Sequence, residues 1–205
     1  MLPYSVFNST QIAPNCEEVS ARRDYIVRLA HEDDYPEIAA LQMRHLVDNL
    51  SESERKDGFL SALMSREQMD AIAKDPGIAV ACRGAEVAGF FCASHLQQWD
   101  GNPIIAALIS SLRRQSLLSD RLQPDTTCLF GPMCLQPRER GTGILLQLYK
   151  FMSESVRDRF STAIAFIAVE NPRSVAAVSK FGWTPATQFL CKGRAYHALF
   201  HDLSP

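Results

Sequence analysis

The strongest constraint on the fold is a strand, a glycine turn and a helix that follow one another closely. The apolar run Cys128–Leu135 predicts a β-strand, and the apolar spacing within Gly143–Phe160 predicts a helix with one buried face. Between them lies Arg140-Gly141-Thr142-Gly143. A helix N-terminus exposes unpaired N–H groups and the positive end of the helix dipole, and glycine lets the backbone approach a ligand closely. The turn is therefore suited to an anion such as a phosphate, although glycines that only turn the chain give the same pattern.

Two common phosphate-binding motifs do not fit this turn. Its spacing is not the G-x-G-x-x-G of dinucleotide-binding proteins, and no G-x-x-x-x-G-K-[ST] motif occurs in the chain. The sequence therefore favours neither a dinucleotide-binding domain nor a P-loop nucleotide hydrolase.

Periodicity and turn residues predict the other elements. In chain order we expect a strand at Tyr25–Leu29, helices at 36–50 and Phe59–Lys74 (the latter with Ser65 as a candidate cap), a hairpin of Ile78–Cys82 and Val87–Leu96, an inserted helix at about 103–118, a strand at Ala163–Val169, a short helix from Asn171-Pro172 to Gly182, and a closing hairpin of Gln188–Cys191 and Tyr196–Phe200. Strands that alternate with helices in this order predict an α/β fold with a mixed sheet and helices on its faces.

Composition and charge exclude several classes of protein. A chain of 205 residues with 46% hydrophobic and 21% charged residues is typical of one globular domain. The net charge of −2 and the scattered Lys and Arg argue against a nucleic acid partner. No apolar run reaches the roughly 18 residues of a membrane span, and residues 1–24 form an irregular lead-in without a secretory segment, so we expect no membrane partner and a cytoplasmic location. The six cysteines form no C-x-x-C pair, so we expect no metal site.

The glycine turn resembles the GNAT superfamily of acyl-CoA-dependent N-acyltransferases. The family pattern V-x-P-x-x-R-G-x-G-I-G maps without gaps on Leu135, Pro137, Arg140, Gly141, Gly143 and Ile144. The sequence departs from the pattern at Leu145, where the family has a small residue. This departure implies altered packing of the helix against the pyrophosphate, but it leaves the N–H donors in place.

A second motif follows about thirty residues later. The segments Glu170-Asn171-Pro172-Arg173-Ser174 and Lys180-Phe181-Gly182-Trp183 look like the family signature N-x-x-S/A…K-x-G-F, at the family's own interval. Together the resemblance covers residues 25–200, an acetyltransferase domain of 25–203 in which the inserted helix is the main departure. It implies a splayed mixed sheet of about seven strands with helices on both faces and with the cofactor between the fourth and fifth strands.

The resemblance implies acetyl-CoA as cosubstrate and direct transfer of its acetyl group to an amine. Backbone N–H groups at Cys134 or Leu135 would polarise the thioester carbonyl, those of Arg140–Leu145 would hold the pyrophosphate, and Asn171 would bind the pantetheine arm. The implied cofactor residues are Cys134, Leu135, Arg140, Gly141, Thr142, Gly143, Ile144, Leu145, Asn171 and Arg173.

The residue that assists the leaving thiolate in the family is replaced in this chain. The family has a tyrosine seven residues after the asparagine, and here that position is Val178. Ser179 and Cys134 are the candidate donors, and the reference thiol pKa of about 8.5 suits Cys134 better. A thiolate also leaves without an acid, and this third alternative is favoured. For the base that deprotonates the amine the candidates are Glu170, His95 and His197, but each is more often an ordinary polar residue at or near a strand.

Two functions remain open on the sequence. The first is an N-acetyltransferase acting on a primary amine, either of a small molecule or of a protein, in a slot formed by helices 36–50 and 59–74 and the closing hairpin, with Tyr196 and Trp99 as candidate lining residues. The second is a non-catalytic acyl-CoA-binding or regulatory protein of the same fold, which Val178 and Leu145 favour. The sequence determines neither which amine is the acceptor nor whether the protein forms a homodimer.

Overall fold

A computed structural model describes residues 25–115 and 119–204. The lead-in predicted for 1–24, and part of the inserted helix predicted at about 103–118, lie outside the described residues. The elements are β1 (Ile26–Leu29), α1 (Tyr35–His45), α2 (Glu52–Arg55), α3 (Arg66–Lys74), β2 (Gly77–Arg83), β3 (Glu86–His95), α4 (Pro103–Arg113), β4 (Thr127–Leu135), α5 (Ile144–Val156), β5 (Thr162–Ala168), α6 (Pro172–Ser179), β6 (Thr184–Cys191) and β7 (Arg194–Asp202). Short 3-10 turns occur between several of them.

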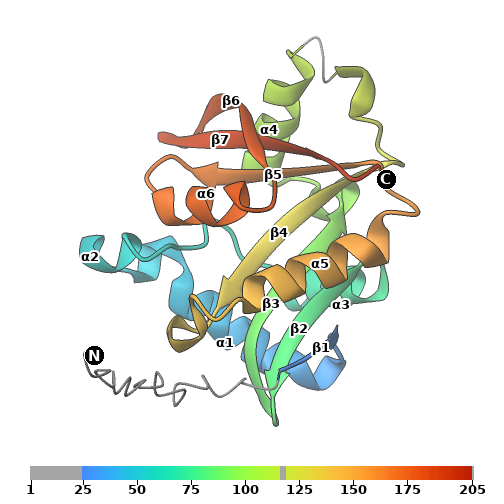
Figure 1. Ribbon diagram of the computed structural model, residues 1–205. Coiled ribbons are helices and arrows are strands. Elements are labelled where there is room, and N and C mark those ends of the chain that lie inside the picture. Colours follow the sequence, from blue (N-terminus) through green and yellow to red (C-terminus); the bar gives the residue numbers. More distant parts are fainter. Residues whose placement is uncertain (1–24, 116–118, 205) are drawn as a thin grey trace, which may run out of the picture.

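Within the described residues the strands form one sheet in the order β1-β2-β3-β4-β5-β7-β6. Only β4 and β5 are parallel neighbours, and every other pair is antiparallel. The parallel pairing covers only Thr127–Leu129 and Thr162–Ile164, although β4 continues to Leu135. The two strands therefore separate toward their carboxyl ends, which splits the sheet into two halves (Figure 1). The predicted splayed mixed sheet is confirmed.

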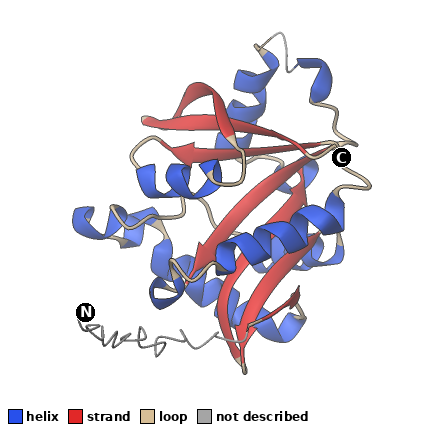
Figure 2. Ribbon diagram, in the orientation of Figure 1, coloured by secondary structure: helices blue, strands red, loops and turns tan. Residues whose placement is uncertain are grey.

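Helices cover both faces of this sheet, as predicted (Figure 2). On one face the apolar sides of α1, α3 and α4 bury Ile38, Ile72 and Leu108 against the strands. On the other face α5 buries Ile144 and Leu148, which recur at the spacing of one helix side. Full burial of each such side chain contributes about 1.5–3 kcal/mol, so the two apolar clusters hold the split sheet in place.

A bulge bends β4 where it leaves β5. Met133 pairs with Phe91 and Phe130 pairs with Ala93, so two residues of β4, Gly131 and Pro132, stand opposite a single residue of β3. Gly131 has a φ of 116°, a backbone conformation that favours glycine. A bulge increases local twist and redirects the strand, and here it turns the end of β4 away from β5.

The structure corrects several element boundaries. The helix predicted from Phe59 starts only at Arg66, because the Ser65 side chain accepts the N–H of Gln68 and caps the helix there. Residues 59–64 form no helix, and Leu60 bridges to Leu46 instead. The helix predicted to reach residue 50 ends at residue 45, and the short helix α2 was not predicted.

Candidate functional site

The glycine turn that follows β4 has the backbone shape that its sequence predicts. Gly143 is the N-cap of α5 and has a φ of 84°, and Gly141 has a φ of 81°. A Cβ atom at either position would meet no described atom within 4 Å. Space beside both glycines is therefore open, and the positive φ is what requires glycine. The Thr142 hydroxyl donates to the carbonyl oxygen of Glu139 at 2.7 Å, so it stabilises the turn itself.

Backbone donors at the start of α5 face this open space. The first intrahelical bonds run from the N–H groups of Leu146 and Gln147 to the carbonyl oxygen of Gly143. The N–H groups of Ile144 and Leu145 come before them and have no acceptor within the helix. Together with the positive dipole end of a 13-residue helix, they form a place suited to an anion.

Positive side chains surround the same space, which we call the turn cavity. It has a volume of about 550 Å³, and its lining includes Leu135, Arg140, Gly143, Arg173 and Lys180. Burial lowers the pKa of the Arg140 guanidinium, and the nearby charge of Arg173 lowers it further. Arg173 itself pairs with Asp57 at 2.7 Å. An anion in the turn cavity would relieve the repulsion between the two arginines.

A buried carboxylate, which was not predicted, anchors the turn to the rest of the sheet. The side chain of Glu139 is fully buried, and it accepts a hydrogen bond from the hydroxyl of Tyr25. Its Oε1 also lies 3.3 Å from Arg83 Nη2 and 3.3 Å from Arg138 Nε. Because Arg83 stands at the end of β2 and Tyr25 directly precedes β1, these contacts tie the turn to the first strands of the sheet.

The separated end of β4 presents backbone N–H groups to the gap between the strands. The N–H of Gln136 donates to the carbonyl oxygen of Ala88 at 2.9 Å, on the β3 side. Because antiparallel pairs alternate, the N–H of Cys134 also points toward β3, whereas those of Met133 and Leu135 point toward β5. Of the two donors considered from the sequence, Leu135 therefore faces the gap and Cys134 does not. Met133 was missed because its orientation depends on the pairing register.

The thiol of Cys134 is a poorer acid than the sequence suggests. Cys134 is only 8% exposed, and its burial raises the pKa of the thiol to about 12. The Cys134 Sγ lies 3.9 Å from the carbonyl oxygen of Leu135, which is a weak contact. The reference pKa that favoured this residue as a proton donor does not apply in the fold.

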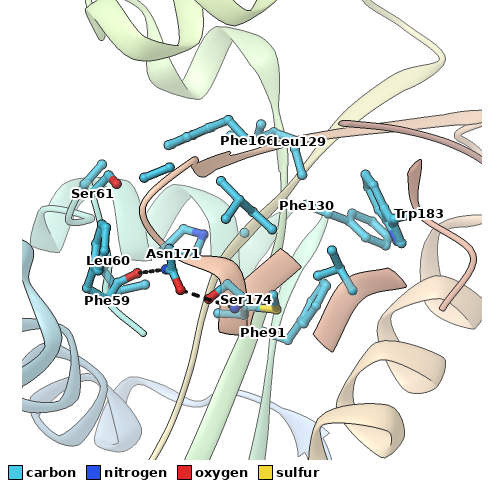
Figure 3. A pocket seen from close by; sticks show the side chains of 18 of the residues that line it. Phe59, Leu60, Ser61, Phe91, Leu129, Phe130, Phe166, Asn171, Ser174 and Trp183 are labelled. Atoms are coloured by element: carbon cyan, nitrogen blue, oxygen red, sulfur yellow. Dashed lines mark hydrogen bonds between the residues drawn. The ribbon is translucent and has the colours of Figure 1, made fainter. Parts of the chain in front are cut away.

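A second cavity, the inner cavity, lies between the separated strands and α6. Its lining includes Phe91, Phe130, Asn171, Val178 and Trp183 (Figure 3). The position at which the family has its tyrosine is thus at the cavity wall, but it carries an apolar side chain. Ser179, the neighbouring candidate, lines neither cavity, and its exposed hydroxyl donates to the carbonyl oxygen of Val175.

Both polar groups of the Asn171 side chain already have partners. Its Nδ2 donates to the carbonyl oxygen of Phe59 at 3.1 Å, and its Oδ1 accepts the N–H of Ser174 at 3.2 Å (Figure 3). Asn171 thus caps α6 and holds the segment before α3. Any contact with a ligand in the inner cavity would use the remaining hydrogen of the amide.

A third cavity, the hairpin cavity, opens toward the β6–β7 turn. It has a volume of about 850 Å³, and Asp48, Glu170, Arg194 and Tyr196 are among its lining residues. The Glu170 carboxylate pairs with Arg194 Nε at 2.8 Å. The hairpin cavity and the inner cavity share Ser61 and Ala62, so the two are neighbours. Its lining residues at 47–48, 61–63 and 191–196 fall within the segments 36–50 and 59–74 and the closing hairpin, from which the acceptor slot was predicted, although 61–63 are not helical.

Of the other candidates from the sequence, the two histidines lie outside the three cavities. His95 pairs with Asp75 at 2.9 Å and stands opposite Cys128, at the end of β4 far from the gap. His197 lines none of the three cavities, and its buried Nδ1 has no hydrogen-bond partner among the described residues. Trp99 lines the inner cavity, but its Nε1 donates to the Ser94 hydroxyl.

Metal-binding clusters and membrane-spanning helices are both absent from the described ranges. No group of three or more His, Cys, Asp or Glu side chains there is arranged to hold a metal ion. No helix of that part of the chain has the length and apolar character needed to cross a membrane.

Comparisons with known proteins find a match at the level of structure. No protein-family model matches the sequence, and no curated protein matches it either. An N-acetyltransferase from Staphylococcus aureus Mu50 superposes with a TM-score of 0.58 at 16% identity, over 88% of this chain and 99% of that one. An acetyltransferase of the GNAT family from Streptococcus pneumoniae superposes with a TM-score of 0.58 at 12% identity, over 87% and 99%. yncA from Salmonella typhimurium, solved with its cofactor acetyl-CoA, gives 0.55 at 13% identity, over 88% and 94%. The divided seven-stranded sheet, with its glycine turn beside the gap, is thus the fold of the GNAT acetyltransferases.

Proposed function

We propose that this protein is an N-acetyltransferase that moves an acetyl group from acetyl-CoA to a primary amine. The observation that carries the proposal is that the turn cavity adjoins the inner cavity in the gap between β4 and β5. The two cavities share Met133 and Phe181 among their lining residues, so one elongated ligand would place an anionic group at the turn and an acyl group in the gap. Solved proteins of the same fold include one with acetyl-CoA as its cofactor.

The pyrophosphate of acetyl-CoA fits the donors of the turn. The N–H groups of the segment Arg140–Leu145 and the side chains of Arg140 and Arg173 would hold it. A phosphate oxygen would then replace the Asp57 carboxylate as the partner of Arg173. The N–H groups of Met133 and Leu135 in the gap would bind the pantetheine arm and polarise the thioester carbonyl. Asn171 would add one hydrogen bond from the α6 side.

The transfer itself needs few side chains. The amine nitrogen forms a bond to the acetyl carbon, the bond from that carbon to sulfur breaks, and the thiolate leaves. Because Val178 is apolar and the Cys134 thiol has its pKa raised to about 12, the thiolate leaves without a side-chain acid. Glu170 is the carboxylate in the hairpin cavity through which the amine proton would reach solvent, directly or along water.

The acceptor enters through the hairpin cavity. The lining carries the carboxylates of Asp48 and Glu170 together with Lys192 and Arg194, and Glu170 already pairs with Arg194, which leaves Asp48 to attract a protonated amine of either a small molecule or a protein. The cysteines Cys82, Cys92, Cys128, Cys134 and Cys191 are free thiols, which supports a reducing compartment such as the cytoplasm.

A panel of amines with acetyl-CoA and the whole protein tests this proposal, with released thiol as the readout. The proposal predicts amine-dependent thiol release that the variant Gly143→Glu loses. The second candidate function is a non-catalytic acyl-CoA-binding protein, which the apolar Val178 at the cavity wall favours. Single-turnover conditions separate the two, because a binding protein would retain acetyl-CoA without releasing thiol with any amine.

A further inference from the structure

The inner cavity continues beyond the place where the thioester is expected. The pantetheine arm would run from the turn past Leu135 and Met133, so the acyl group arrives in the gap and points into the inner cavity. That cavity ends among aromatic side chains. Figure 3 shows Phe130 and Trp183 at the end away from Phe59 and Asn171, and their ring centroids are 5.9 Å apart.

The side chains at this end of the lining are mostly apolar. Phe91 packs edge-on against Phe130 at 5.3 Å, and Val178 is 6% exposed. The one phenol in the lining, Tyr149, has its hydroxyl 2.8 Å from His201 Nε2, so it already has a hydrogen-bond partner. An aliphatic chain placed here would bury apolar surface against these side chains and would not disturb the hydrogen bond of the Tyr149 hydroxyl.

The size of the inner cavity sets the length of that chain. Its volume is about 100 Å³. An apolar cavity of about 150 Å³ holds benzene, which has six carbons, so about 100 Å³ corresponds to roughly four carbons. Acetyl has only two, and it would leave the aromatic end of the cavity empty.

We propose that the site takes short aliphatic acyl groups longer than acetyl, with butyryl as the best fit, and transfers them to the same amine. This inference rests on the proposed function. The amine nitrogen bonds to the acyl carbonyl carbon, the bond from carbon to sulfur breaks, and CoA leaves as the thiolate, to which the proton lost by the amine is finally passed. The only change from acetyl transfer is the length of the chain that fills the inner cavity.

Calorimetric titration of the whole protein with CoA and with acetyl-, propionyl-, butyryl- and hexanoyl-CoA tests this inference. Each methylene buried in an apolar site tightens binding about fourfold. The expected Kd therefore falls about fourfold from acetyl to propionyl and again from propionyl to butyryl, and then rises for hexanoyl, which exceeds the space. Equal affinity for acetyl- and butyryl-CoA, or weaker binding of butyryl-CoA, would overturn the inference and leave the proposed function standing.

Substitutions on α6 locate the effect. Val178→Phe fills the inner cavity and should abolish the gain from acetyl to butyryl, whereas Val175→Phe, on the same helix but lining none of the three cavities, should keep it. Val178→Ala enlarges the cavity and should move the optimum toward hexanoyl, which decides the matter even if the phenylalanine variant does not fold. An unchanged preference in Val178→Ala would contradict the assignment of the acyl chain to this cavity. Failure of every CoA compound to bind the wild-type protein would overturn the proposed function together with the inference.

Discussion

The Nδ2 of Asn171 donates a hydrogen bond to the carbonyl oxygen of Phe59 at 3.1 Å, across 112 positions of the sequence. A second tie, the ion pair of Arg173 with Asp57, lies beside it. Phe59 belongs to the segment between α2 and α3, which forms part of the lining of both the turn cavity and the inner cavity. The start of α6 thus holds part of the wall of the turn and inner cavities. A substitution that weakens these two contacts should therefore affect both the stability of the protein and the shape of the cavities.

Asn171→Ala should destabilise the protein by about 2–4 kcal/mol. Loss of the helix cap costs about 1 kcal/mol, and an unpaired buried carbonyl at Phe59 costs a further 1–3 kcal/mol. Asn102→Ala is the matched control, because Asn102 also caps a helix, through the N–H groups of Ile104 and Ile105, and its side chain bonds to no other segment of the described residues. Chemical denaturation of both variants measures the difference. Equal losses in the two variants would show that the bond to Phe59 adds nothing.

Gly143→Glu should weaken acetyl-CoA binding at least tenfold, on the order of 1.4 kcal/mol. The substitution places a bulky carboxylate where the pyrophosphate is proposed to lie. Gly84→Glu is its control, since Gly84 also has a positive φ (61°) and open space at its Cβ, but lies in the β2–β3 turn. Calorimetry with both variants gives the affinities. If both bind acetyl-CoA equally well, the glycine turn only shapes the chain.

Arg140→Gln should raise the Kd for acetyl-CoA by roughly tenfold or more, because a hydrogen bond to a charged partner contributes about 1.5–3 kcal/mol. The effect should be largest at low ionic strength, since salt screens the attraction. Arg113→Gln, at the exposed end of α4, removes the same charge away from the three cavities and should leave the Kd unchanged. A salt titration of both variants checks this. A similar small change in both would mean that only net charge matters.

The local parts of this site were predictable, and the long-range parts were not. The strand, the glycine turn and the helix follow one another in sequence, so their periodicity and their glycines sufficed to predict them. The anchor of the turn was missed because Tyr25 lies 114 positions before Glu139, and no local pattern joins them. The orientation of the Met133 N–H depends on the bulge at Gly131 and Pro132, which shifts the register against β3.

Burial accounts for two further differences between the sequence and the structure. A reference pKa describes a thiol in water, and Cys134 is enclosed by the first apolar cluster. The role of Asn171 at the ligand stays a prediction, but its two partners in the fold, Phe59 and Ser174, were not predicted, because a buried amide needs partners that the fold supplies. The sequence identifies such residues but does not tell which neighbours the fold brings to them.

Cys134→Ala should leave kcat within a factor of two and the Kd for acetyl-CoA unchanged. A thiol whose pKa is raised to about 12 is a weak proton donor, and the backbone N–H groups of β4 remain in the variant. Steady-state kinetics and calorimetry separate the two parameters. A marked loss of kcat at unchanged affinity would instead make this thiol the acid for the leaving thiolate.

The free energy of unfolding should fall as the pH drops from about 7.5 to 5.5, in part through His201. Burial lowers the pKa of His201 in the folded protein, whereas the unfolded chain takes up the proton near the ordinary pKa of about 6.5. The unfolded state then binds more protons, so stability is fully present above the unfolded pKa and is lost below it. Chemical denaturation of wild type and His201→Gln across this range measures the slope. The variant should show the smaller slope, and equal slopes would contradict a buried neutral His201.

Titration of the whole protein with acetyl-CoA in a calorimeter tests the central claim most directly. The account predicts a saturable heat with one site per chain, and a melting temperature that rises with acetyl-CoA concentration because the ligand binds only the folded state. Absence of both the heat and the thermal shift at millimolar acetyl-CoA would contradict the claim that the glycine turn and the gap between β4 and β5 form a cofactor site.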